Sequence, residues 1–144
     1  MPVVYFDSSA LVKLVVEEEG SDLASQIWDG CDAAVSSRLA YPEVCAALAA
    51  ARRNHDLSSK GVRSAERDWE QFWHAIRPIE LSTEVQQSAG ALARHHALRG
   101  ADAVHLASAL AVTDPQLVVV VWDRRLRSGV EAEGLAIAPS TLDQ

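Results

Sequence analysis

The stretch Val3-Val4-Tyr5-Phe6-Asp7-Ser8-Ser9 decides how the rest of the chain is interpreted. Four β-branched or aromatic residues are too few for a helix and suit a buried parallel strand, whereas an acid followed by two hydroxyl residues is typical of a helix start. We therefore expect Asp7 at the carboxyl end of a strand. Because ligands bind at that edge of open α/β sheets, Asp7 is a candidate site residue.

Working outward from this stretch, four more segments have the composition of short strands, with helical patterns between them. The expected strands are 33–36, 77–81, 117–122 and 135–138, and the expected helices are 10–17, 21–28, 39–53, 62–76, 83–98, 103–112 and one after Asp123. Ser21 and Ser82 are the expected N-caps of two of these helices. The alternation predicts an α/β fold with a mainly parallel central sheet flanked by helices, in a single domain over residues 1–144.

Composition limits the classes of protein that fit. The formal net charge of −7 argues against a broad basic surface for DNA, although it leaves room for an enzyme that reaches nucleic acid through metal ions. The longest strongly apolar run, Leu117 to Trp122, is too short to cross a membrane. The apolar run at the N-terminus ends after four residues and has no basic region before it, so we expect a cytoplasmic protein and no secretion signal.

Four acids share one expected position in the fold. Asp7 and Asp123 each follow an apolar strand, and Glu43 and Asp102 lie near the starts of helices. Since a helix start beside a strand end faces the same crevice, we expect the four carboxylates to converge. Such a cluster repels itself unless cations neutralise it, and oxygen ligands without histidine or thiolate suit Mg²⁺ or Mn²⁺.

Four motifs, in this order, resemble those of PIN domains, and most closely those of VapC-type toxins. They are Asp7-Ser8-Ser9-Ala10-Leu11, Glu43 in a helix, Arg99-Gly100-Ala101-Asp102-Ala103-Val104-His105-Leu106-Ala107, and Trp122-Asp123. The resemblance covers about residues 5–126. It implies a PIN-type fold, a homodimer, a cognate VapB-type antitoxin as partner, and Mg²⁺- or Mn²⁺-dependent hydrolysis of RNA such as tRNA or ribosomal RNA.

The resemblance also implies a role for each matching residue. Asp7, Asp102 and Asp123 would bind the main metal ion, directly or through water. Glu43 would complete the site. Ser9 matches the small hydroxyl residue beside the first acid, and it would orient Asp7 or a metal-bound water.

Single residues have simpler interpretations as well. Asp7 and Asp123 also fit N-caps, and Asp102 fits an acid favoured by the dipole at a helix start. Arg124 and Arg125 follow Asp123 directly, so they are candidates for phosphate contacts but fit solvated helix charges too. For His105, three positions after Asp102, a packed or hydrogen-bonded histidine is the favoured interpretation.

Two other classes of protein compete with the ribonuclease. Aspartyl-phosphate phosphatases and receivers also carry acids at strand ends, but the phosphatase requires a second acid at position 9, which is serine, and residues 135–140 lack the lysine of a receiver. The other competitor is a catalytically inactive PIN-like binding module. The presence of all four acids argues against that module, and an assay decides.

Overall fold

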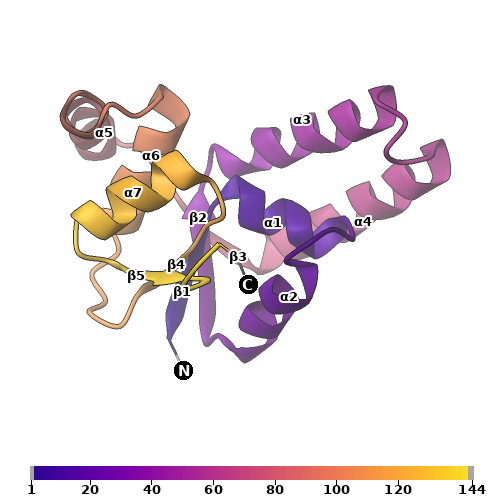
Figure 1. The fold of residues 1–144 in the computed structure, drawn as a ribbon, viewed down its shortest axis with the longest axis horizontal. Helices are drawn as coiled ribbons and strands as arrows, with labels where there is room; N and C mark the ends of the chain where they lie inside the picture. Colours follow the sequence, from indigo (N-terminus) through magenta and orange to yellow (C-terminus); the bar gives the residue numbers. More distant parts are fainter. Residues whose placement is uncertain (1, 143–144) are drawn as a thin grey trace.

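A wholly parallel sheet runs through the middle of the molecule (Figure 1). In the computed structural model, which describes residues 2–142, its strands are β1 (Val3–Phe6), β2 (Ala33–Ser37), β3 (Ile76–Ile79), β4 (Val118–Val120) and β5 (Ala136–Ala138). Their order is β3-β2-β1-β4-β5, and every neighbouring pair is parallel. The predicted α/β fold is confirmed.

Helices cover both faces of this sheet. They are α1 (Ser8–Val15), α2 (Ser21–Gly30), α3 (Ala40–Arg53), α4 (Ser59–Ala75), α5 (Thr83–His96), α6 (Gly100–Leu110) and α7 (Arg124–Ala132). Figure 1 shows α5, α6 and α7 on one side of the sheet, with α3 and α4 lying side by side as an extension from the other. Among residues 2–142, no helix combines the length and the apolar character needed to cross a membrane.

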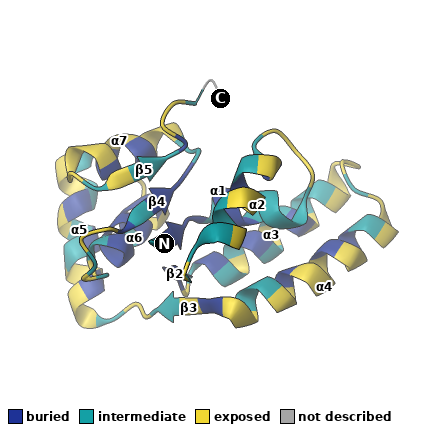
Figure 2. Cartoon of the chain, turned by 90° about the horizontal axis from the view of Figure 1, so that it is seen from below, coloured by how far each residue is buried: buried dark blue, intermediate teal, exposed yellow. Residues whose placement is uncertain are grey.

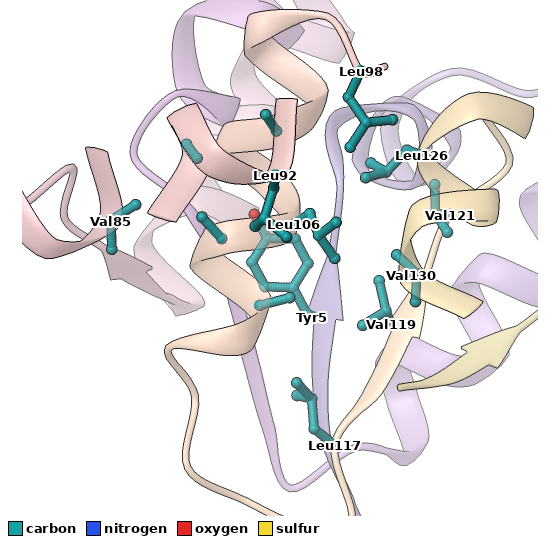
Figure 3. Close-up of a cluster of buried hydrophobic side chains, with 14 of the residues drawn as sticks. Tyr5, Val85, Leu92, Leu98, Leu106, Leu117, Val119, Val121, Leu126 and Val130 are labelled. Atoms are coloured by element: carbon teal, nitrogen blue, oxygen red, sulfur yellow. The ribbon is translucent and has the colours of Figure 1, made fainter. Parts of the chain in front are cut away.

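The alternation of side chains along β1 builds a core on each face of the sheet. Val4 and Phe6 belong to a cluster with residues of α1, α3 and α4, whereas Tyr5 belongs to a cluster with residues of α5, α6 and α7. Figure 3 shows Tyr5 packed in the second cluster beside Leu106. The inner strands β1 and β2 are mostly buried, whereas the edge strands β3 and β5 are mostly intermediate or exposed (Figure 2). Strand β1 is therefore buried on both faces.

The strand order defines where a ligand can bind. β1 lies at the centre, with β2 on one side and β4 on the other, so the chain reverses its direction of travel across the sheet at β1. In open α/β sheets the crevice beyond the carboxyl ends of the strands at such a point is the usual binding site. Asp7 comes directly after β1, which places it at this edge, as predicted.

One predicted cap is wrong and one is confirmed. Ser21 is the first residue of α2, not its N-cap, and its hydroxyl donates instead to the Val16 carbonyl at 2.9 Å. Gly20 holds the cap position with a φ of 92°, and a Cβ there would lie 3.0 Å from the Trp122 ring, so glycine suits this position doubly. Ser82 does cap α5.

Candidate active site

Asp7 is at once a helix cap and a buried carboxylate at the sheet edge. Its Oδ1 accepts a hydrogen bond from the Ala10 backbone N–H at 3.0 Å, which makes it the N-cap of α1. The Ser9 hydroxyl lies 2.7 Å from Oδ1 and 2.9 Å from Oδ2, and the residue is only 4% exposed. The side chain is thus fixed in orientation, and Ser9 is the residue that fixes it together with the helix start.

Electrostatics make Asp7 unusual among the acids. Burial raises the pKa of its carboxyl to about 6, and the Asp123 charge acts in the same direction. Hydrogen bonds from the Ser9 hydroxyl and the Ala10 N–H lower that pKa but do not compensate for burial. No Lys or Arg among the described residues forms an ion pair with Asp7. Its ionised form therefore needs a positive partner.

Asp102 and Asp123 are joined by an arginine. Asp123 follows β4 and caps α7 by accepting from the Leu126 N–H at 3.1 Å. Asp102 is the third residue of α6, so the helix begins earlier than predicted. The Arg99 guanidinium lies 3.1 Å from Asp102 through Nε and 3.5 Å from Asp123 through a terminal nitrogen. One side chain with a positive charge therefore spans both carboxylates.

Glu43 lies in the first turn of α3, where Pro42 is tolerated because it precedes the helical hydrogen bonds. Its Oε1 accepts from the Ser8 hydroxyl at 2.5 Å and lies 2.6 Å from His105 Nε2. Burial alone raises the pKa of Glu43, but the hydrogen bonds with His105 and Ser8 outweigh burial and lower it. Glu43 is therefore held as an anion.

His105 is packed and hydrogen-bonded, and the favoured interpretation is confirmed. It is 3% exposed, and its Nδ1 lies 2.7 Å from the Tyr5 hydroxyl. Its link to Glu43 was not predicted, nor was a role for Ser8 or Arg99. The available signal was their location within the quoted motifs, with Arg99 three residues before Asp102 and His105 three residues after it.

The acids gather at one edge, but as linked pairs. Among residues 2–142, no group of three or more His, Cys, Asp and Glu side chains is placed to hold a metal ion together. Arg99 pairs with both Asp102 and Asp123, whereas Glu43 accepts from Ser8 and lies beside His105. Metal ligation by these acids stays a prediction.

The two arginines after Asp123 lie at the start of α7. Arg124 and Arg125 are both exposed, so they are accessible to a ligand at this edge. Contact with RNA phosphates stays a prediction for both.

Comparisons with known proteins agree with this architecture. The sequence model described as "PIN domain" matches residues 4–127, which span β1 through the first half of α7. The chain therefore belongs to the PIN domain family. That membership decides against the aspartyl-phosphate phosphatase and receiver alternatives.

Within the family, the chain groups with the VapC proteins. It is 69% identical to Ribonuclease VapC45 and to Ribonuclease VapC49, from two strains of Mycobacterium tuberculosis, over 99% of this chain and 99% of each relative. Ribonuclease VapC46 of the same species is 33% identical over 97% of this chain and 100% of its own. The similarity thus runs through every element of the fold.

Two solved structures share the fold at low sequence identity. A toxin–antitoxin complex from Klebsiella pneumoniae gives a TM-score of 0.61 at 19% identity, over 88% of this chain and 92% of that one. VapBC2 from Rickettsia felis, bound to a DNA fragment from its promoter, gives a TM-score of 0.63 at 11% identity, over 94% of this chain and 96% of that one. These similarities support the chain fold described above.

Proposed function

We propose that this chain is a divalent-metal-dependent endoribonuclease and the toxin of a cytoplasmic toxin–antitoxin pair. Its relatives at 69% identity are named ribonucleases, and the family match spans residues 4–127. The observation that carries the proposal is the set of acids at the carboxyl edge of the sheet. Buried Asp7 follows β1, Asp123 follows neighbouring β4, and a guanidinium already spans Asp123 and Asp102.

The residues at this edge fit Mg²⁺ or Mn²⁺ by their chemistry. Asp7, Asp102, Asp123 and Glu43 offer carboxylate oxygens, which these ions prefer. Burial raises the pKa of Asp7 to about 6, because the contacts around the carboxylate do not fully stabilise its negative charge. An adjacent cation would stabilise that charge. A bound divalent ion would lower the pKa of a water and neutralise charge on the phosphodiester.

Each side chain then has a defined task. Asp7, Asp102 and Asp123 would hold the ion, with Glu43 completing the set. Ser9 keeps both oxygens of Asp7 oriented, so this carboxylate loses little freedom when it binds. Setting the four acids aside reduces the net charge from −7 to −3, which lowers the barrier to RNA approach.

The experiment that tests this proposal is an RNA cleavage assay. Purified protein is incubated with tRNA and ribosomal RNA in Mg²⁺, in Mn²⁺ and in EDTA. We expect internal cleavage that requires the ion. Cleavage that is equally fast in EDTA would contradict the metal dependence, and no cleavage of any RNA would favour the inactive binding module.

Arg99 provides a prediction about metal affinity. Its charge competes with a divalent ion for Asp102 and Asp123, and its side chain is 63% exposed, so the contact is weak. Exposed ion pairs are weak, so Arg99→Gln should raise the Mn²⁺ affinity only modestly, by about fivefold at most. Calorimetric titration measures the change, with Arg38→Gln, which removes the exposed pair with Glu80, as the matched control. Weaker Mn²⁺ binding by Arg99→Gln would show that the arginine supports the ion.

The toxin role makes a prediction in cells. High-level expression of the wild-type chain should slow bacterial growth, whereas Asp7→Asn should not. We expect relief by a small antitoxin, encoded beside the toxin, that brings an apolar helix and a basic side chain. The contact of Arg99 with Asp102 and Asp123 supports the expectation that these acids accept such a side chain. Normal growth with abundant wild-type protein would count against the toxin role.

The family resemblance also implies a homodimer, and analytical sedimentation of the purified protein measures whether two copies associate.

A further inference from the structure

A chain of hydrogen bonds runs from the sheet to Glu43 through two buried side chains. The Ser37 backbone N–H lies 3.2 Å from the Tyr5 hydroxyl, which lies 2.7 Å from His105 Nδ1. His105 Nε2 lies 2.6 Å from Glu43 Oε1. Tyr5 is fully buried and His105 is 3% exposed, so water does not replace these partners.

The donors and acceptors in this series of hydrogen bonds allow only one direction of donation, from Ser37 toward Glu43. A backbone N–H can only donate, so the Tyr5 oxygen accepts from Ser37. A phenol ordinarily keeps its proton at neutral pH, so the Tyr5 hydroxyl has one proton to donate. That proton is directed to His105 Nδ1. We accordingly assign the proton of the imidazole to Nε2, from which it is donated to Glu43.

Both hydrogen bonds to Glu43 fall on the same oxygen. The Ser8 hydroxyl also donates to Oε1, and it lies 3.0 Å from His105 Nε2, so the three groups form a compact triangle. The Glu43 side chain is 30% exposed, so part of it is accessible to solvent. The printed contacts with Ser8 and His105 both use Oε1 and leave Oε2 outside this triangle.

We propose that His105 is a positioning residue that, held by Tyr5, fixes the orientation of Glu43 through Oε1, so that this carboxylate would be ready to help hold a divalent ion. This inference rests on the proposed function, because it needs Glu43 to act as a ligand. An oriented carboxylate loses less side-chain entropy on binding, and partners of metal ligands commonly change metal affinity by roughly 10–100-fold. Burying an imidazole costs free energy unless its nitrogens are hydrogen-bonded, and here Nδ1 lies beside Tyr5 and Nε2 beside Glu43.

The test begins with Mn²⁺ titrated into the protein without RNA. His105→Leu removes the donor and should weaken Mn²⁺ binding by about tenfold or more. His105→Gln can place an amide N–H near the position of Nε2, and we expect it to retain most of the affinity. His96→Leu is the matched control, since His96 pairs with Glu133 at 2.7 Å away from the four acids. Equal affinity in wild type and His105→Leu would overturn the proposal.

A double-mutant cycle separates positioning from general damage to the fold. Glu43→Gln alone should weaken Mn²⁺ binding, and His105→Leu should then add little, because its effect passes through Glu43. Fully additive losses would overturn the proposal. If His105→Leu does not fold, the cycle is run with Tyr5→Phe, which keeps the ring but frees His105 Nδ1 and should weaken binding by several-fold.

Nitrogen-15 NMR of the His105 ring gives a readout independent of metal. We expect the ring proton on Nε2 in wild type and a mixture of the two tautomers in Tyr5→Phe. A proton found on Nδ1 in wild type, or a tautomer that Tyr5→Phe leaves unchanged, would overturn the assignment. A wild type that binds no Mn²⁺ overturns the proposed metal dependence and this inference together, whereas binding that His105 does not affect overturns this inference alone.

Discussion

Asp7→Asn is expected to abolish RNA cleavage by this chain while leaving its fold intact. An amide is a poor substitute for an anionic metal ligand. When catalytic groups act as a unit, removing one of them typically lowers the rate by roughly 10³-fold or more. The fold should survive because asparagine caps helices about as well as aspartate, so the bond to the Ala10 N–H can persist. Single-turnover cleavage rates in Mn²⁺ measure the loss.

The neighbouring acids and a control complete that experiment. Asp102→Asn and Asp123→Asn should lose activity to a similar extent, and combined substitutions should add little, because the proposal assigns all three acids to one site. Asp114→Asn is the matched control: Asp114 accepts from the Gln116 N–H just before β4, at the opposite end of that strand from Asp123. Full activity in two of the three site variants would contradict a shared site.

The same substitution at Asp7 should stabilise the metal-free protein at neutral pH. The folded pKa of Asp7 is about 6 and the ordinary value is 3.8, so burial disfavours its ionised form by about 3 kcal/mol. An asparagine side chain at this position carries no charge and avoids this cost. Imperfect hydrogen bonds of the amide cancel part of this gain. We therefore expect Asp7→Asn to raise the free energy of unfolding by about 2 kcal/mol in EDTA at neutral pH, or the Tm by roughly 4–8 °C.

The pH dependence of that difference follows from the sign of the shift. Below pH 3.8 Asp7 is protonated in both the folded and unfolded states, so the charge cost is absent. As the pH rises to about 6, the unfolded chain releases its proton first, and wild type steadily loses stability relative to Asp7→Asn. Above that range the difference should be constant. A difference that grows toward acid pH would contradict the assigned cause.

Metal addition should reverse the order. Mn²⁺ at about a hundredfold excess over its dissociation constant stabilises a folded protein by about 2.7 kcal/mol if the unfolded chain does not bind it. Wild type should gain this amount, while the gain of Asp7→Asn should shrink or vanish. Calorimetric melts of both proteins, with and without Mn²⁺, measure the shifts. Identical shifts would reject Asp7 as a ligand.

Short-range signals account for the parts of the fold that the sequence predicted. β1 and the Asp7 cap follow from adjacent residues, because an apolar run ending at an acid and two hydroxyls has few other solutions. The cap of α2 depends instead on Gly20 packing against Trp122, which is remote in the chain. No local pattern could place Ser21 correctly without that contact.

The sequence predicts the candidate site as a set of residues but not as a set of contacts. The motifs singled out the four acids and Ser9, and the hydrogen bonds from Ser9 to Asp7 fit its expected orienting role. The link from His105 to Glu43 joins residues 62 positions apart, and its link to Tyr5 joins residues 100 apart. These contacts depend on how α3 and α6 pack around β1, which periodicity does not specify.

Mn²⁺ electron paramagnetic resonance tests the central claim most directly, because the signal of the free ion is lost when the ion binds protein. The measurement compares wild type, Asp7→Asn and Asp114→Asn at equal concentrations and increasing Mn²⁺. We expect saturable binding by wild type and by Asp114→Asn, and little binding by Asp7→Asn. Equal amounts of bound Mn²⁺ in all three proteins would contradict a metal site built on Asp7.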